Sequence, residues 1–143
     1  MKIELTRADD AYNFISTSEE GHTVVSDGSV GIGGGNKGMR PMEMVLSALA
    51  SCSSIDVVMI LKKQRQQLDD IKVTITGNRA TDQVPAVFTD IHIHFQLTGT
   101  IKPKKAEQAV TGSMEKYCSV SKMLEPTVKI THSHEIVYKE VTT

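Results

Sequence analysis

The sequence contains little cysteine and almost no net charge, and these shortages exclude several classes of protein. Two cysteines in 143 residues are too few for a disulfide-stabilised scaffold. The formal net charge is −1, so no basic surface favours nucleic acid or an anionic membrane. The segment MKIELTRADDAYNF carries scattered charge without an apolar core, unlike a signal peptide. No run approaches the roughly 18 uncharged apolar residues of a membrane span. We therefore expect a cytoplasmic protein with reduced thiols.

The pattern along the chain predicts a single domain, residues 1–143, of the α+β class with a largely antiparallel sheet. Three short β-like stretches come first (KIELTR, YNFIST and HTVVSDG), and a flexible glycine-rich loop, GIGGGNKG, follows them. Two strands with a period of two, IKVTITG and DIHIHFQL, come after a long helix. A second helix opens at Pro103, and a short helical turn follows Cys118. The apolar stripe of the helix that opens at Pro103 contains Ala106, Ala109, Val110, Met114 and Tyr117. The tail TVKITHSHEIVYKEV predicts a final strand or hairpin.

The long helix, predicted over residues 41–66, indicates a dimer. Its 26 residues would span about 39 Å, whereas a compact domain of this length has a radius of gyration of only about 14–15 Å. The middle of the helix is apolar nearly all round, and one small sheet cannot cover every face. Small residues such as Ala48 and Ser51 would let another backbone approach closely. We therefore expect a homodimer in which partner helices lie together.

Two patterns suggest cofactors, but their context is weak. Gly33, Gly35 and Gly38 satisfy G-x-G-x-x-G, yet the acidic residue expected about 20 positions later is missing, because that position falls inside the same helix. His92-x-His94 and His132-x-His134 have a spacing that can chelate zinc, but no third ligand is visible. We expect neither an organic cofactor nor a metal, although a metal-dependent protein built on the histidines stays an alternative.

The two cysteines leave a choice between redox chemistry and simple packing. Cys118, in KYCSVSK, stands where the free N–H groups of a short helix stabilise a thiolate. Cys52 is in mid-helix, and Asp56 one turn later disfavours its thiolate unless a cation offsets the carboxylate. Free cysteines are commonly buried filler, so the residues alone leave both readings open.

A resemblance to a known family bears on this choice. RPMEMVLSALASCSSIDVV looks like the cysteine-bearing helix of the OsmC/Ohr family, and EKYCSVSKML looks like its second-cysteine motif. The early Asp27-Gly28 pair and the glycine-rich loop also match, and the similarity runs through essentially the whole chain. The chain is most similar to the OsmC-like branch related to the organic hydroperoxide reductases. The resemblance implies an intertwined homodimer with two central helices.

It also implies a thiol peroxidase that serves in defence against peroxide stress. Cys52 would reduce an organic hydroperoxide and become a sulfenic acid, and Cys118 would then form a disulfide with it. An external dithiol would reduce that disulfide, and no metal or organic cofactor would be needed. An apolar pocket at the dimer seam would favour organic peroxides over hydrogen peroxide.

The chain departs from the reductase pattern at three positions. Met42 stands where the reductases have a glutamate, and the carboxylate comes one residue later, at Glu43. No motif identifies the arginine that holds the thiolate in the reductases, so Arg40 and Arg7 are candidates by their places in the sequence alone. Arg40 and Glu43 precede Cys52 by more than two helical turns, so each would have to serve the partner's thiol. Ser119 replaces the proline that usually follows the second cysteine.

The predicted catalytic residues are therefore Cys52, Cys118, Arg40 and Glu43. The first alternative is a binding protein of the same fold, which holds a small hydrophobic molecule in the seam pocket while its thiols do not turn over. The second is the histidine-based metal protein.

Overall fold

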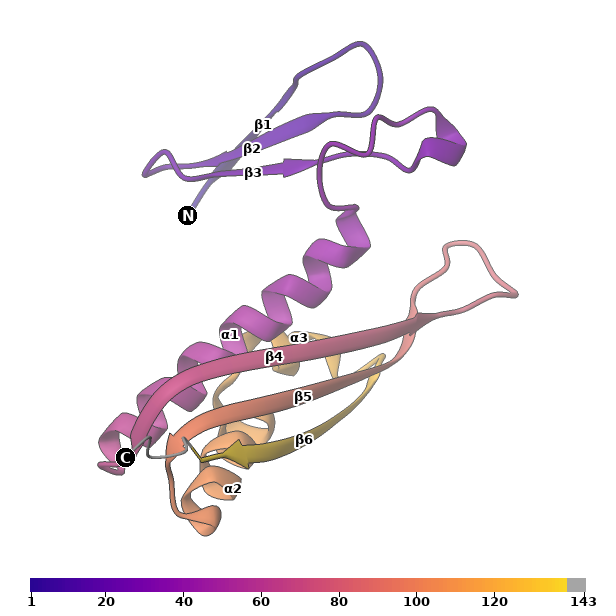
Figure 1. Cartoon of the computed structure of the whole chain (residues 1–143). Helices are drawn as coiled ribbons and strands as arrows, with labels where there is room; N and C mark the ends of the chain where they lie inside the picture. The colour runs from indigo at the N-terminus through magenta and orange to yellow at the C-terminus, as the bar shows by residue number, and fades with distance from the viewer. Residues whose placement is uncertain (139–143) are drawn as a thin grey trace. The chain divides into compact units, whose positions relative to one another are not determined.

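The computed structural model describes residues 1–138, and these divide into two compact units. The first unit is Met1–Val45 and the second begins at Leu46. Each is described by itself below, although one helix, α1, begins in the first and continues into the second (Figure 1). The last residues of the predicted tail segment, residues 139–141, lie outside the described part.

The first unit is a three-stranded antiparallel sheet followed by the glycine-rich loop. Its strands are β1 (Ile3–Arg7), β2 (Phe14–Ser18) and β3 (Thr23–Ser26), as the sequence predicts. The loop contains a short 3₁₀ turn, η1 (Val30–Ile32), and winds around the buried carboxylate of Asp27. That carboxylate accepts backbone N–H bonds from Gly28 at 2.7 Å and from Lys37 at 3.0 Å. The loop predicted as flexible therefore has a fixed hydrogen-bonded framework.

The loop does not have the surroundings of a dinucleotide site. Such a site requires a strand, a helix and a second parallel strand, whereas the strands on either side of α1 belong to different sheets. A glycine is needed at position 34 for a different reason. A Cβ atom there would lie 2.0 Å from the carbonyl oxygen of Gly28. The glycines thus serve close backbone packing within the loop.

The long helix α1 (Pro41–Lys63) ends three residues earlier than the sequence predicts. Arg65 takes a left-handed conformation, with φ of 56°. Its N–H bonds to the carbonyl of Lys62, and the N–H of Gln66 bonds to that of Leu61, both at 3.0 Å. This pair of bonds is a Schellman motif, which usually has glycine at the left-handed position. Because an arginine occupies the position where glycine usually marks a helix end, the sequence does not reveal where α1 stops.

The second unit contains a three-stranded mixed sheet with helices against one face (Figure 1). Strands β4 (Gln67–Arg79) and β5 (Phe88–Thr100) are antiparallel, but β6 (Lys129–Val137) runs parallel to β5. A parallel neighbour needs a long crossover, and three helical segments supply it. They are α2 (Pro103–Gly112), a π-helical turn, η2 (Ser113–Tyr117), and α3 (Ser119–Leu124). The predicted α+β class with largely antiparallel pairing is confirmed, and β5–β6 is the parallel exception among the described strands.

The core of the second unit lies between β5 and the helices. The predicted apolar face of β5 is confirmed, because Ile91, Ile93, Phe95 and Leu97 are each at most 1% exposed. In the crossover, Ala106, Ala109, Val110 and Met114 are buried, but Tyr117 is 54% exposed. The prediction that Tyr117 belongs to the apolar stripe is wrong. The π-helical turn places an extra residue in the helix and rotates the residues after it off the stripe.

Helix α1 buries only part of its surface within this chain. Leu49, Val57 and Leu61 are fully buried, whereas Ile55 is 66% exposed. Ser54, Ile55, Val58, Met59 and Lys62 line a shallow, mainly apolar depression on the exposed side. By length and composition alone α1 could cross a membrane, so the expectation that no segment approaches such a span is wrong. A helix that packs its apolar residues into a protein core meets the same criterion.

Candidate active site

Helix α1 carries Cys52 and Asp56 on one face, because residues four apart lie one above the other. The neighbouring Ser53 is fully buried, and its hydroxyl donates a hydrogen bond to the carbonyl of Leu49 at 2.8 Å. Ser54 donates to the carbonyl of Ala50 at 2.6 Å. Serine hydroxyls satisfied by the preceding turn keep the polar groups around the thiol paired inside an apolar helix.

The π-helical turn positions the second thiol. The N–H of Cys118 donates to the carbonyl of Ser113 at 2.8 Å, which closes a five-residue turn. The hydroxyl of Ser113 donates to the carbonyl of Ser53 at 2.9 Å and ties the turn to α1. Cys118 is then the N-cap of α3, and its Sγ accepts the N–H of Ser121 at 3.4 Å. This confirms that the N–H groups of a short helix face the Cys118 sulfur.

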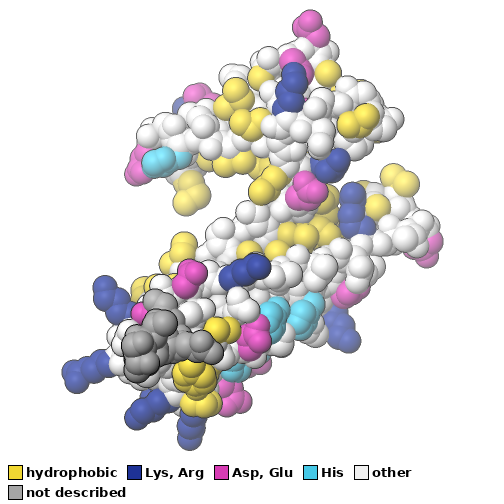
Figure 2. Space-filling model, in the orientation of Figure 1, with side chains coloured by type: hydrophobic (Ala, Val, Ile, Leu, Met, Phe, Trp, Pro, Cys, Tyr) yellow, Lys and Arg dark blue, Asp and Glu magenta, His cyan; other side chains and the backbone are white. Residues whose placement is uncertain are grey.

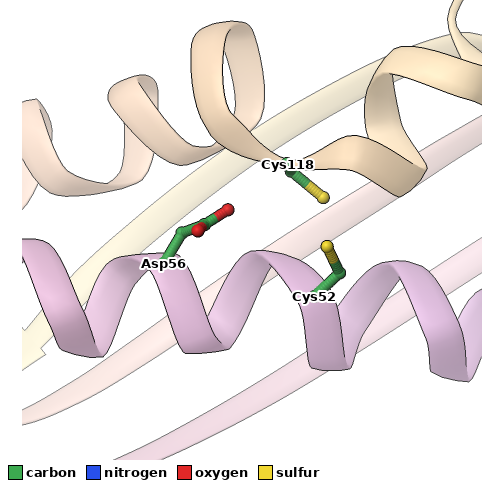
Figure 3. Close-up of side chains that lie close together, drawn as sticks. All are labelled: Cys52, Asp56 and Cys118. Carbon is green, nitrogen blue, oxygen red and sulfur yellow. The ribbon is translucent and has the colours of Figure 1, made fainter.

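The structure brings the two thiols and one carboxylate together (Figure 3). The sulfur atoms of Cys52 and Cys118 and a carboxylate oxygen of Asp56 all lie within 4.8 Å of one another. A disulfide has an S–S distance of about 2.05 Å, so the two sulfur atoms would have to come closer together to form one. Cys118 is 2% exposed and Cys52 is partly exposed, so Cys52 is the thiol that an incoming molecule reaches first.

Burial raises the pKa of the Cys118 thiol to about 11. A hydrogen bond with Cys52 and its charge act in the same direction, whereas the N–H groups of Ser121 and Val120 lower the pKa. Desolvation therefore outweighs the help of the helix N-terminus. At neutral pH Cys118 stays protonated, and its S–H can donate a hydrogen bond to the sulfur of Cys52. The two thiols therefore differ in their surroundings, since Cys118 is buried and Cys52 is partly exposed.

Asp56 is the member of the cluster that the sequence-based site lacks. Its Oδ2 atom is buried and has no hydrogen-bond partner among the described residues. A buried carboxylate oxygen without a partner is costly, and such groups gather at functional sites. The spacing of four from Cys52 was the only signal in the sequence, and it does not reveal that Cys118 would come to the same place.

Arg40 and Glu43 lie in the first unit and contact each other. The Arg40 guanidinium is 3.3 Å from a carboxylate oxygen of Glu43, and the other oxygen accepts the backbone N–H of Arg40 at 2.9 Å. Glu43 thus caps the N-terminus of α1, where its charge also suits the helix dipole. The parts of both residues in thiol chemistry stay predictions.

The histidine pairs have partners in the sheet. Both ring nitrogens of His92 lie within 2.9 Å of hydroxyl oxygens, those of Thr131 and Ser133 on β6. His94 contacts Ser133 at 2.8 Å and Glu135 at 3.4 Å. Figure 2 shows histidine side chains together on the surface of the second unit. In residues 1–138, the three-residue group of potential metal ligands is Cys52, Asp56 and Cys118, and it contains no histidine.

These features define a class of small α+β protein in which a central helix and the start of a short helix present a pair of thiols. The family model described as OsmC-like protein matches residues 34–133, and the chain belongs to this family. Protein YhfA of Escherichia coli strain K12 is 46% identical over 125 residues, which cover 87% of this chain and 90% of that protein.

Solved structures give the same result. A hypothetical protein from Aquifex aeolicus VF5 superposes with a TM-score of 0.84 at 36% identity, and 97% of each chain is covered. An organic hydroperoxide resistance protein OsmC from Legionella pneumophila superposes with a TM-score of 0.71 over 94% of this chain and 97% of its own. Its identity is 17%, so this likeness shows the fold. The resemblance drawn from the sequence is confirmed.

Proposed function

We propose that this protein is a thiol peroxidase that reduces organic hydroperoxides in defence against peroxide stress. The Cys52 thiolate attacks one oxygen of the O–O bond, the alkoxide leaves and takes a proton, and Cys52 becomes a sulfenic acid. The Cys118 thiol then attacks that sulfur and water leaves, which gives the Cys52–Cys118 disulfide. An external dithiol reduces the disulfide and is itself oxidised.

The observation that carries the proposal is the approach of the two sulfur atoms within 4.8 Å, with Cys52 the more accessible. Membership of the OsmC-like family and the printed name of the Legionella pneumophila protein support the choice of organic hydroperoxides. A reduced thiol pair requires a reducing compartment, so we place the protein in the cytoplasm. Cell fractionation that finds it in an oxidising compartment would contradict that placement.

A binding protein without turnover is the second candidate, and the position of Asp56 favours it. A carboxylate within 4.8 Å of both sulfur atoms disfavours thiolate formation. Incubation with an organic hydroperoxide and excess dithiol separates the two functions. Catalytic loss of the hydroperoxide, many molecules per protein chain, supports the peroxidase. Hydroperoxide that binds but is not consumed supports the binding protein.

We propose that Arg40 supplies the cation that offsets this carboxylate, from the partner subunit, and that Glu43 orients it. Arg40→Met should then slow the alkylation of Cys52 at neutral pH by about tenfold, because a nearby cation favours a charged thiolate. Arg79→Met is the matched control, since Arg79 is exposed and bonds only locally, to the carbonyl of Ala86. Equal alkylation rates across the pH range in Arg40→Met and the native protein would remove Arg40 from the mechanism.

We propose that the functional form is a homodimer whose contact includes the exposed side of α1. Ile55 is 66% exposed there, beside Val58 and Met59, and association would cover these apolar side chains. Light scattering at micromolar concentration should give twice the chain mass. Ile55→Asp should shift this mass to that of the single chain, whereas Val84→Asp, at a residue 98% exposed, should not. A folded native monomer at that concentration would contradict the dimer.

A further inference from the structure

The cluster of Cys52, Asp56 and Cys118 has the composition of a metal site as well as that of a redox site. We propose that the reduced protein binds one thiophilic divalent cation of the zinc type through the two sulfur atoms and the Asp56 carboxylate. The site differs from the histidine pairs, which the sequence suggested for a metal. It needs only the reduced thiols, so it does not depend on peroxide turnover.

The donor set and its spacing fit zinc. Zinc takes thiolate ligands at about 2.3 Å and carboxylate ligands at about 2.0–2.2 Å in a tetrahedral arrangement. Two sulfur ligands of such a site lie about 3.8 Å apart, as the geometry of that tetrahedron requires. The donor atoms here lie within 4.8 Å of one another, so they need to close by no more than about 1 Å. Three protein ligands leave the fourth position open, as in catalytic zinc sites.

Two local features prepare the site for a cation. The Asp56 Oδ2 atom is buried without a hydrogen-bond partner among the described residues, and a metal ion would satisfy it. The Ser121 N–H that points at the Cys118 sulfur would remain as an outer-shell bond to the coordinated thiolate. A thiolate at Cys118 is costly because it is buried, and a bound cation that replaces the thiol proton would offset this cost.

One member of the cluster, Asp56, borders a groove that is open to solvent. Asp56 lines a groove of about 510 Å³, together with Met59, Ile60, Lys63, Gln64, Gln108, Gly112, Lys116 and Tyr117. The groove is lined by both apolar and charged side chains and is open on one side. The groove therefore brings solvent to the side of Asp56.

Binding of the cation and oxidation of the thiols exclude each other. When the pair reduces a hydroperoxide, the two cysteines together give up two electrons and two protons, the S–S bond forms, and the oxygen atoms leave as alcohol and water. The disulfide no longer offers thiolate ligands, so the cation is released. Conversely, a bound cation occupies the lone pairs with which Cys52 would attack the hydroperoxide.

The experiment uses the full-length reduced protein, zinc alone, and a competing chromophoric chelator. We expect one zinc per chain, and its release when the protein is oxidised to the disulfide. Loss of an outer-shell partner already weakens metal binding by about 10-fold to 100-fold, so Asp56→Asn, which removes a direct ligand, should weaken it by at least about 100-fold. Asp82→Asn, at an exposed loop residue, is the matched control and should bind as the native protein does.

Cobalt provides a second readout that does not depend on activity. Cobalt bound by the reduced protein should show the sulfur-to-metal charge-transfer absorption of thiolate ligation, and Cys118→Ser should diminish it. Absence of stoichiometric zinc binding, or cobalt bound without that absorption, would overturn the proposal. Unchanged affinity in Asp56→Asn with native circular dichroism would also overturn it. These experiments measure metal binding and not turnover, so failure of the metal proposal would not count against the proposed peroxidase activity.

Discussion

Cys52→Ser is expected to abolish the reduction of organic hydroperoxides, with a loss of at least about a thousandfold, because a serine hydroxyl is not ionised at neutral pH and is a poor nucleophile. The substitution should leave the fold intact. Serine is smaller than cysteine and already occupies the neighbouring positions 51, 53 and 54, and the hydroxyls of Ser53 and Ser54 bond to carbonyls of the preceding turn. The measurement is the rate of hydroperoxide loss with excess dithiol, alongside circular dichroism of both proteins.

The matched control for this substitution is the second cysteine. Cys118→Ser removes a thiol from the same cluster but leaves the more exposed sulfur, that of Cys52. In a single-turnover experiment Cys118→Ser should therefore still reduce one equivalent of hydroperoxide, and Cys52→Ser should reduce none. Retained turnover in Cys52→Ser would mean that Cys118, or neither cysteine, is the nucleophile.

Cys118→Ser should nevertheless lose steady-state turnover and should expose Cys52 to irreversible oxidation. Without a partner thiol the Cys52 sulfenic acid cannot form the intramolecular disulfide, so further hydroperoxide converts it to sulfinic acid. The native protein should resist this, because the Cys118 sulfur lies within 4.8 Å and can trap the sulfenic acid. Mass spectrometry of both proteins after excess hydroperoxide measures the difference. Equal sulfinic acid in the two proteins would exclude Cys118 as the resolving cysteine.

The raised pKa of Cys118 is the reason that we expect different results from substituting the two cysteines. A thiol with a pKa of about 11 is almost fully protonated at neutral pH, so it does not compete with Cys52 for the first attack. As the pH rises toward that value Cys118 ionises, and the hydrogen bond it can donate to Cys52 is lost. The roles of the two cysteines should therefore be most distinct near neutral pH.

Strong local patterns made most elements of the fold predictable. The alternation of Ile91, Ile93, Phe95 and Leu97 identifies a strand with one buried face, and the structure confirms it. The end of α1 was hidden, since Arg65 takes a left-handed conformation that glycine usually adopts. The exposed position of Tyr117 was also hidden, because a π-helical turn leaves no regular trace in the sequence.

The candidate site was only partly predictable for a related reason. Resemblance to a family pointed to Cys52 and Cys118, but their contact depends on the bond from Ser113 to the backbone of Ser53, 60 positions away. No sequence period reports a long-range bond of this kind. Asp56 shared the face of Cys52 from the outset, yet the unpaired state of its Oδ2 atom follows only from the packing around it.

One measurement tests the central claim, that Cys52 and Cys118 form a single redox pair. The reduced protein is treated with one equivalent of an organic hydroperoxide, its remaining thiols are alkylated, and the digested peptides are identified by mass spectrometry. The account predicts loss of both free thiols and an intramolecular peptide pair that joins Cys52 to Cys118. Two free, alkylatable thiols after the hydroperoxide has been consumed, or Cys52 oxidised to sulfinic acid beside a free Cys118, would contradict it.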